Sequence, residues 1–374
     1  MAITPVTAVI LAAGRSTRME QFKPLLPIGN KPVIERCLSM FKNAGIRDMR
    51  VVIGHLKDQM EPVLKKAGAG IIVNRNDSPE MFSSVCAALK DLEAEVQSIA
   101  LLPGDVPLVR PWTVYYLLKK HAENPQHILV PGFQGKRGHP VIIPEAFFGL
   151  IRSWDGHDGL RGVFKSLSDH IMDIPVGDAN IRFDMDSPED YEEAKERWLK
   201  FSVPGKDECL SILRDVFNVD ETIISHCGLV ADMAGKICDA LVQNGCRMDG
   251  NIITAAGFLH DMAKGSKDHE KKAADLLREM GFPGVASIVA DHTDLDCSDR
   301  SPINPSEVLY LADKLVDGTR RVTVDERFKG AMDKFGHDPE VRKKIERRMN
   351  HARIIMKKVR HSIGETAAQH LFSF

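Results

Sequence analysis

Small and basic residues follow the first apolar stretch of the chain, residues 6–12. In order, the segment contains Leu11, Ala12, Ala13, Gly14, Arg15 and Arg18, and Lys23 follows. Small residues let the backbone approach a triphosphate closely, so that its N–H groups can bind phosphate oxygens. Arg15, Arg18 and Lys23 supply positive charge for that anion and for a leaving pyrophosphate. Because the pattern fits neither G-x-G-x-x-G nor G-x-x-x-x-G-K-[ST], it disfavours a dinucleotide fingerprint and a P-loop.

Carboxylates at two places in the same half could hold a magnesium ion. Asp105 stands just past the apolar run 98–102, where open α/β sheets bind ligands, and it is placed to hold Mg²⁺ on nucleotide phosphates. Asp184 and Asp186 occupy alternate positions of an extended segment, and we expect them to point to opposite faces. One of them then joins Asp105 and the other caps the following helix. We favour Asp184 as the ligand, but the spacing alone does not decide.

Histidines and aspartates in the second half have the chemistry of a metal centre. The set comprises His226, His260, Asp261 and Asp313, with His269 and His292 between them. Neutral imidazole and carboxylate are the mixed ligands that suit Mn²⁺, Fe²⁺, Zn²⁺ or Mg²⁺. His226, the pair His260-Asp261 and Asp313 each fall inside a predicted helix. The pattern therefore predicts a divalent metal site between helices.

The first 200 residues alternate short β-rich runs with amphipathic helical patterns. The expected strands are residues 6–12, 50–54, 70–74, 98–102, 127–130 and 141–143, and the expected helices include 31–43, 57–67 and 82–94. This alternation predicts a mainly parallel, doubly wound sheet covered on both faces. Ser187 as N-cap and Pro188 at the first helical position predict a last helix that ends near residue 200.

Residues 201–207 are expected to be a linker, and residues 208–374 an all-α domain. Strand-like runs disappear after the linker. The expected helices cover residues 221–243, 252–263, 269–280, 285–291, 307–315 and 338–359.

Composition narrows the function classes. The chain has 374 residues and a formal net charge of −2, so two domains are expected and a generally basic nucleic-acid surface is not. No apolar run reaches the roughly 18 residues that span a bilayer. Seven cysteines without a C-x-x-C pair suit a reducing compartment. We therefore expect a cytoplasmic protein that binds neither nucleic acid nor membrane.

Five motifs of the first half resemble the molybdenum cofactor cytidylyltransferase family, a MobA-like group of NTP transferases. They are L-A-A-G-R-S-x-R-M at 11–19, K-P-L-L-P at 23–27, P-G-D-V-P-L at 103–108, G-K-R-G-H-P-V at 135–141 and D-M-D-S-P-E-D-Y at 184–191. The resemblance covers about residues 5–198 and implies a Rossmann-like sheet. That family joins CMP from CTP to the phosphate of molybdopterin with Mg²⁺ and releases pyrophosphate. The sister guanylyltransferases usually have L-A-G-G in the first motif, so Ala13 resembles the cytidylyl branch.

The resemblance also implies roles for individual residues. Residues 12–15 and Lys23 would hold CTP, Ser83 and Ser84 would shape the base pocket, and Gly138 with His139 would face the pterin. It implies CTP and molybdopterin, or another small phosphorylated acceptor, as ligands, and molybdoenzyme maturation factors as partners.

The second half resembles the HD phosphohydrolase superfamily over about residues 220–325. The motifs that carry this likeness are G-F-L-H-D-M-A-K at 257–264, D-H at 291–292 and L-A-D-K-L-V at 311–316. In that family the first His, the His-Asp pair and the last Asp bind one metal. His269 and His292 stand where a second metal would add ligands, and Lys264 would lie near the substrate phosphate.

Three hypotheses follow. The leading one is a bifunctional enzyme that transfers CMP to molybdopterin in its first domain and hydrolyses a phosphoester or nucleotide in its second. A second keeps the transferase but changes the acceptor, for example to a sugar phosphate, because acceptor choice depends on pocket shape. A third is a nucleotide or metal sensor without turnover.

Overall fold

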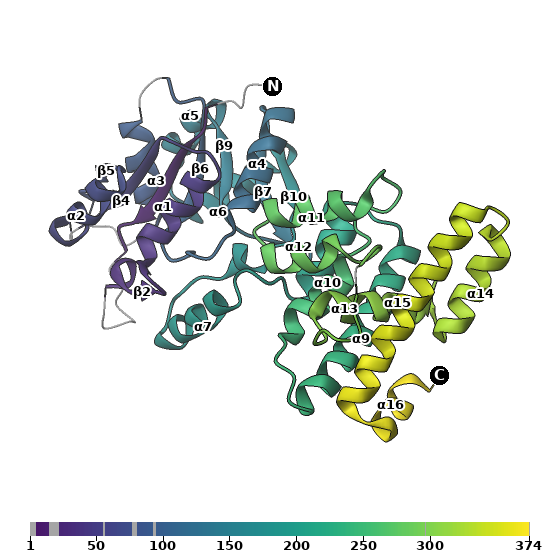
Figure 1. Ribbon diagram of the computed structural model, residues 1–374. Coiled ribbons are helices and arrows are strands. Elements are labelled where there is room, and N and C mark those ends of the chain that lie inside the picture. Colours follow the sequence, from purple (N-terminus) through teal and green to yellow (C-terminus); the bar gives the residue numbers. More distant parts are fainter. Residues whose placement is uncertain are drawn as a thin grey trace. The chain divides into compact units, whose positions relative to one another are not determined.

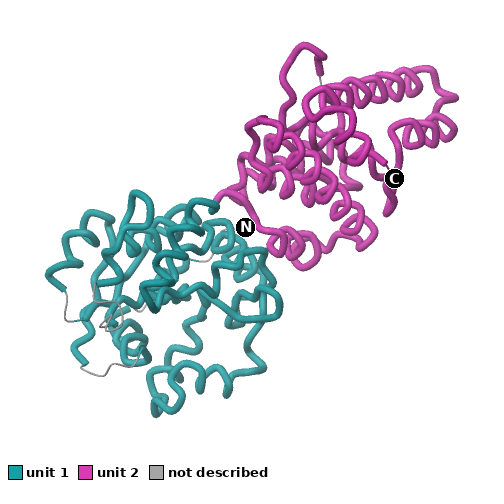
Figure 2. Tube along the Cα trace, turned by 90° about the horizontal axis from the view of Figure 1, so that it is seen from below, with its two compact units in different colours: residues 1–201 teal, residues 202–374 magenta. Residues whose placement is uncertain are grey.

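The structure is a computed structural model that describes residues 5–14, 22–54, 57–76, 81–92, 95–295 and 297–373. It divides into two compact units, residues 1–201 and 202–374 (Figure 2). The first unit is a sheet covered by helices and the second is almost entirely helical (Figure 1), which confirms the predicted fold classes. Helix α8 (Lys206–Ser211) begins inside the stretch that was predicted to be a linker.

Eight strands of the described part of the first unit form one sheet, in the order β10-β7-β9-β6-β1-β4-β5 with β8 beside β7. Their bounds are β1 (Thr7–Ala12), β4 (Met49–Ile53), β5 (Gly70–Val73), β6 (Ser98–Pro103), β7 (Ile128–Phe133), β8 (Lys136–Arg137), β9 (Val141–Pro144) and β10 (Ile171–Pro175). β1 pairs in parallel with β4 and β6, and β4–β5 and β7–β10 are also parallel. β9 runs antiparallel between β6 and β7. A separate short hairpin joins β2 (Pro27–Ile28) to β3 (Lys31–Pro32).

Alternate residues of β1 belong to the two cores of the unit. Ala8 and Ile10 pack in one core and Val9 and Leu11 in the other, as the period of two in a strand requires. The helices that supply the first core are α1 (Val33–Asn43), α2 (Lys57–Ala67) and α4 (Pro111–Glu123). Those that supply the second are α3 (Met81–Asp91), α5 (Phe148–Ser153) and α6 (Gly159–Ser166). All six residues of β1 are buried because both faces of the sheet are covered.

A third, smaller core holds the segment that carries Asp184 and Asp186. Phe183 and Met185 are buried there against α7 (Pro188–Leu199), whereas the two aspartates between and after them are exposed. The expectation that these acids point to opposite faces was wrong, because residues two apart in an extended chain share a face. Neither aspartate caps α7: the N-cap is Ser187, in a reciprocal capping box with Asp190.

A buried network around Asp178 holds the short helix η4 (Ala179–Arg182) that precedes this segment. The Asp178 carboxylate accepts hydrogen bonds from the Arg110 backbone N–H and guanidinium and from the Thr113 hydroxyl, each at 2.8 Å. It also accepts two from Asn180 at 3.1 Å. Asp178 is 1% exposed and Arg110 5%, so the pair is shielded from water.

The second unit is built from nine α-helices of the described chain and one short hairpin. The helices are α8, α9 (Glu221–Gln243), α10 (Gly250–Leu259), α11 (His269–Glu279), α12 (Pro283–Ala290), α13 (Pro305–Lys314), α14 (Val324–Phe335), α15 (Pro339–Ile363) and α16 (Glu365–Phe372). The hairpin joins β11 (Val316–Asp317) to β12 (Arg320–Arg321). One expectation is corrected: α10 ends at Leu259, so His260 is its C-cap and Asp261 lies in the following turn, not within the helix. Among the described residues, no helix combines the length and the apolarity needed to cross a membrane.

We expect Asp178→Ala to destabilise the first unit strongly. The substitution would leave the Arg110 guanidinium buried without its carboxylate, and breaking such a pair costs about 3–5 kcal/mol. All three tryptophans, Trp112, Trp154 and Trp198, lie in the first unit, so urea unfolding followed by tryptophan fluorescence reports on that unit alone. Asp173→Ala is the matched control, because it removes the exposed ion pair between Asp173 and Arg137. Equal losses from the two substitutions would contradict the assigned role of Asp178.

Candidate active sites

The end of β6 lies against the end of β1. The Gly104 N–H donates to the Leu11 carbonyl at 2.9 Å, and a Cβ at Gly104 would come within 2.9 Å of that same oxygen. Only glycine permits this approach. Asp105, the next residue, is therefore carried to the carboxyl edge of the sheet next to the segment that leads into Gly14.

Two further carboxylates and a lysine face Asp105. The Met185 N–H donates to the Asp105 carbonyl at 3.0 Å and brings Asp184 and Asp186 beside it. Lys23, in helix η1 (Lys23–Leu25), donates to the Asp186 carboxylate at 2.9 Å. Burial raises the pKa of Asp105, the Lys23 charge opposes that rise, and the charges of Asp186 and Asp184 add to it.

Three carboxylates and one ammonium group at one edge leave an excess of negative charge. A divalent cation would relieve this repulsion, and oxygen ligands of this kind suit Mg²⁺. The observed arrangement therefore fits the predicted magnesium site. Which of Asp184 and Asp186 would be the ligand stays a prediction.

A cavity of about 980 Å³ opens beside this cluster. Leu11 of β1 and Pro103 of β6 line it, together with Gly138 and His139, so residues of three predicted motifs share one space. Burial lowers the pKa of His139 to about 4 against the opposing charge of Asp184, so the imidazole is neutral at pH 7.

Five further side chains that line this cavity were missed as site residues from the sequence. They are three basic ones, Arg137, Arg161 and Lys165, and the aromatic Phe82 and Phe164. Arg161 and Lys165 lie on α6, an element that was not predicted, and their spacing of four residues on a helix was the available signal.

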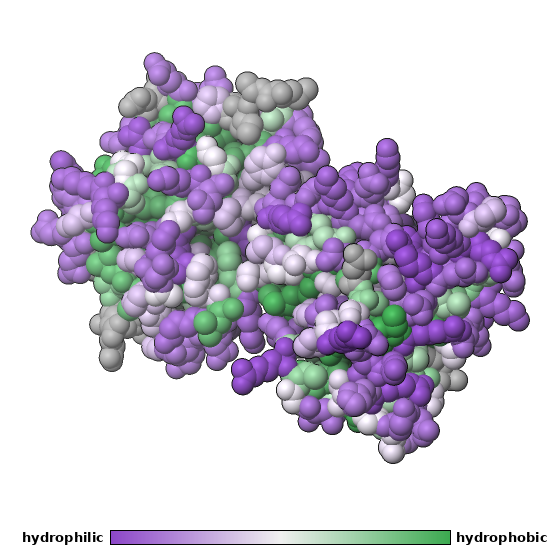
Figure 3. All heavy atoms as spheres, in the orientation of Figure 1, coloured by the Kyte–Doolittle hydropathy of each residue, from purple (hydrophilic) through white to green (hydrophobic). Residues whose placement is uncertain are grey.

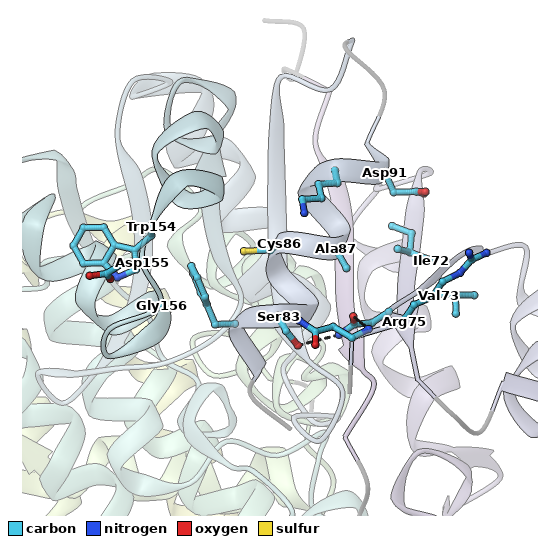
Figure 4. Close-up of a pocket in the computed structure, with 14 residues that line it drawn as sticks. Ile72, Val73, Arg75, Ser83, Cys86, Ala87, Asp91, Trp154, Asp155 and Gly156 are labelled. Carbon is cyan, nitrogen blue, oxygen red and sulfur yellow. Dashed lines mark hydrogen bonds between the residues drawn. The ribbon is translucent and has the colours of Figure 1, made fainter. Parts of the chain in front are cut away.

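Ser83 and Ser84 lie at the start of α3 and share a partner from the end of β5. The Asn74 side-chain amide donates to the Ser83 hydroxyl at 3.0 Å and to the Ser84 hydroxyl at 3.1 Å. Ser83 lines a second pocket of about 560 Å³ between β5, α3 and the segment around Trp154 (Figure 4). Ser84 is buried and lines neither cavity. In the sequence, Asn74 was predicted only as the last residue of the strand 70–74, with no signal for a role at the site.

The remaining residues of the first motif are partly described. Ala12 and Ala13 lie at the end of β1, with Ala12 buried and Gly104 packed against it. Gly14 is exposed. Arg15 and Arg18 fall outside the described residues.

The histidines and aspartates of the second unit converge as two groups that share one carboxylate. His226, His260 and Asp261 form one group, and Asp261, His269 and His292 the other. Within each group the candidate ligand atoms lie within 4.8 Å of one another. Asp313 joins the first group, with its Oδ1 3.2 Å from His226 Nε2 and 3.7 Å from His260 Nε2.

Close packing of two helices produces this convergence. A Cβ at Gly257 of α10 would lie 2.5 Å from the Ala231 Cα of α9, so only glycine lets the helices approach this far. His226 on α9 and His260 at the end of α10 then come together, and their ring centroids are 5.5 Å apart.

Backbone carbonyls orient three of the imidazoles. Nδ1 of His226 lies 3.0 Å from the Gly318 carbonyl, Nδ1 of His260 2.8 Å from Gly257, and Nδ1 of His292 2.7 Å from Val289. Each contact leaves Nε2 facing the cluster, as metal-binding histidines require. His260 Nε2 is buried and has no hydrogen-bond partner among the described residues. An orphaned imidazole nitrogen facing two carboxylates fits a divalent cation.

The carboxylates of this cluster are kept ionised. Although burial works against the charged form of Asp261, its hydrogen bond with His292 and the charges of His260 and Lys264 hold its pKa well below the usual range. For Asp313, the Lys314 charge, the hydrogen bond of His226 and the charge of His260 likewise outweigh burial and lower the pKa. Two ionised carboxylates in this cluster can bind a cation without releasing protons of their own.

Two lysines border the cluster. Lys264 donates to Asp261 Oδ2 at 2.5 Å, where the sequence predicted a phosphate-contacting residue. Lys314, which was missed, contacts the other side of the cluster through the Asp313 carboxylate. Its position directly after Asp313 was the only signal.

Comparison with known proteins agrees with this division. Residues 8–171 match the family described as the MobA-like NTP transferase domain, and residues 223–316 match the HD domain. The chain contains a MobA-like NTP transferase domain and an HD domain. The first of these two domains is therefore of the nucleotidyltransferase type.

Two relatives and one solved structure each match between 37% and 53% of this chain. The bifunctional protein GlmU of Carboxydothermus hydrogenoformans is 29% identical over 148 residues, which are 38% of this chain and 32% of GlmU. The chain thus spans about a third of that relative. An uncharacterized protein of Methanocaldococcus jannaschii is 26% identical over 37% of this chain and 91% of its own length. A crystal structure from Mycobacterium sp. strain JC1, a homolog of Rv0371c of M. tuberculosis, is 26% identical, covers 53% of this chain and 98% of its own, and has a TM-score of 0.48.

The depressed pKa of His139 predicts a pH dependence for the NTP transferase domain. The unfolded chain binds a proton near the ordinary value of 6.5, whereas the folded domain does so only near 4. The free energy of unfolding should therefore fall as the pH drops from about 7 to 4, by on the order of 3 kcal/mol from this residue. His139→Asn should remove this part of the slope in tryptophan-monitored urea unfolding, and His157→Asn, at an exposed histidine, should not. An unchanged slope in His139→Asn would refute the prediction.

The shared carboxylate predicts how substitutions change metal stoichiometry in the HD domain. Asp261→Ala should remove two Mn²⁺ ions per chain, because both groups lose a ligand, whereas His269→Ala should remove one. Equilibrium dialysis of the full chain with metal analysis measures this, and binding to the NTP transferase domain contributes equally to every sample. His361→Ala, at an exposed histidine, is the control. Equal losses in Asp261→Ala and His269→Ala would contradict two groups.

Proposed function

We propose that the NTP transferase domain transfers CMP from CTP to the phosphate of molybdopterin and releases pyrophosphate. The observation that carries the proposal is the meeting of Lys23 with Asp105, Asp184 and Asp186 at the carboxyl edge of β6. Such an edge is where open α/β sheets bind ligands. A cluster of three carboxylates and the Lys23 ammonium group suits a magnesium-bound triphosphate.

The reaction requires little acid–base chemistry. An oxygen of the acceptor phosphate forms a bond to the α-phosphorus of CTP, the bond from that phosphorus to the oxygen bridging to the β-phosphate breaks, and pyrophosphate leaves with the electron pair. When bound, Mg²⁺ would neutralise charge on the triphosphate, and Asp105 with Asp184 or Asp186 would hold it. Lys23 exchanges its contact with Asp186 for a phosphate oxygen of the leaving group. Catalysis then depends on in-line positioning and charge neutralisation.

The large cavity supports an acceptor that is both anionic and ring-shaped. Arg137, Arg161 and Lys165 can bind its phosphate, while Phe82 and Phe164 offer flat apolar surface. Gly138 and the neutral His139 line the same cavity. The choice of CTP rests on the cytidylyl-like Ala12-Ala13-Gly14 motif, and a sugar phosphate is the alternative acceptor.

For the HD domain we infer hydrolysis of a phosphoester or nucleotide. The two ligand groups that share Asp261 could hold a pair of divalent cations, which when bound would supply activated water and charge stabilisation at the ester. The chain's own residues orient the site: backbone carbonyls fix three imidazoles, and Lys264 and Lys314 lie at its border.

One assay of the full chain separates the two activities. We measure pyrophosphate release with CTP, GTP and ATP against molybdopterin and sugar phosphates, and phosphate release from nucleotides and phosphomonoesters with Mn²⁺. Asp105→Asn should lower transfer at least 100-fold and leave hydrolysis unchanged, because the ligand of one site is lost. Asp261→Asn should do the reverse.

Several results would decide against the proposal. Transfer to a sugar phosphate but not to molybdopterin would show that the acceptor is a sugar phosphate. A preference for GTP would show that the nucleotide is GTP and not CTP. Ligand binding without turnover in either unit would favour a sensor. Equal loss of both activities in Asp105→Asn would exclude separate sites.

A further inference from the structure

The HD domain has a cavity of about 450 Å³ whose lining includes none of the candidate metal ligands. It lies between the end of α13, α14 and α15. Most of its lining falls between Arg327 and Arg348, beyond residue 316 where the match to the HD domain ends. Most of the cavity lining therefore lies outside the residues that match the HD domain.

One residue that lines this cavity also contacts a candidate metal ligand. Lys314 lines the cavity, and its ammonium group contacts the Asp313 carboxylate. The other oxygen of Asp313 faces His226 at 3.2 Å. A group bound at Lys314 thus lies next to the candidate metal ligands.

The charge of the cavity is strongly positive. Four basic side chains line it and only one carboxylate, Asp317, does. Arg327 is held by Asp317 at 2.6 Å and Arg348 by Asp294 at 3.5 Å, so both are oriented before any ligand binds. Lys334 has no carboxylate partner in the part of the chain that the structure describes. Hydrophilic side chains also predominate on the face of α14 and α15 seen in Figure 3.

The remaining lining is apolar and aromatic. Phe328 and Ile345 form a buried floor, at 5% and 8% exposure, while the Phe335 ring is 53% exposed at the rim beside Lys334. A phenyl ring left in water next to a cation offers a stacking surface for a planar group. The volume lies within the roughly 300–1,000 Å³ that small-molecule sites occupy.

We propose that this cavity binds the nucleoside of a nucleoside phosphate, with the base on Phe335 and the phosphate at Lys314 beside the metal cluster. Cations alone would suit inorganic phosphate, and apolar surface alone a lipid or peptide, but their combination next to a candidate phosphoesterase centre selects a nucleotide. The inference rests on the proposed hydrolysis by the HD domain and names its substrate class.

Binding to the full chain tests the proposal without turnover. In an Asp261→Asn background, isothermal titration compares AMP with inorganic phosphate as probes. We expect AMP to bind at least tenfold more tightly than phosphate. Phe335→Ala should weaken AMP binding roughly tenfold and leave phosphate binding unchanged. Lys334→Ala should weaken both, and Lys329→Ala, at an exposed lysine of α14 outside the cavity, should change neither.

Kinetics on the chain with Asp261 intact give the second readout. Phe335→Ala should raise KM for AMP about tenfold with kcat within twofold, should not affect methyl phosphate, and should be rescued by Phe335→Tyr. AMP affinity insensitive to both Phe335→Ala and Lys334→Ala, or phosphate bound as tightly as AMP, would overturn the proposal. Hydrolysis with a KM insensitive to Phe335→Ala would overturn this inference alone. Phe335-dependent binding without any hydrolysis would overturn the hydrolase function and keep the site.

Discussion

A carboxylate withdrawn from water must be compensated by positive charge, and both candidate sites are arranged around such a group. Burial raises the pKa of Asp105, two further carboxylates add to this rise, and the Lys23 charge offsets it only in part. Asp261 sits among imidazoles and a lysine, and its pKa falls. The first environment favours a cation that arrives with an anionic ligand, whereas the second is ready to keep a cation permanently. This contrast matches a magnesium ion brought with a nucleotide and a resident metal centre.

Close backbone approach supplies the geometry in both units. Gly104 lets β6 approach the end of β1, and Gly257 lets α10 approach α9. In the first unit the Asp178 network then fixes η4, whose Ile181 carbonyl accepts a 2.8 Å hydrogen bond from the His139 N–H. The buried Asp178 carboxylate thereby fixes the backbone position of His139 in the cavity lining and of the segment that carries Asp184 and Asp186.

The sequence predicted elements whose periodicity is local, and it predicted poorly what depends on tertiary packing. The strands and the candidate metal ligands followed from apolar runs and residue types, and the two units were expected. The end of α10 at Leu259 was not predicted, because the helical pattern continues through His260. In the structure the His260 imidazole forms a hydrogen bond with the Gly257 carbonyl instead. Arg161 and Lys165 belong to no motif, and α6 is short. Their role could be inferred only once the fold places them in the cavity that Leu11 also lines. Asp178 carried no signal because three of its five donors come from Arg110 and Thr113, which are distant in the sequence.

Substrate choice in both units depends on residues outside the catalytic clusters. In the proposed functions, the carboxylates near Asp105 and the histidines around Asp261 would bind metal and phosphate, which many substrates share. The groups that could discriminate, Phe164 with Lys165 in one unit and Phe335 with Lys334 in the other, pair an aromatic ring with an adjacent cation at a cavity wall. Such a pair recognises a ring and a charge together, and it can change without disturbing the buried carboxylates on which each unit depends. Specificity can therefore diverge between relatives while the chemistry of each site stays the same.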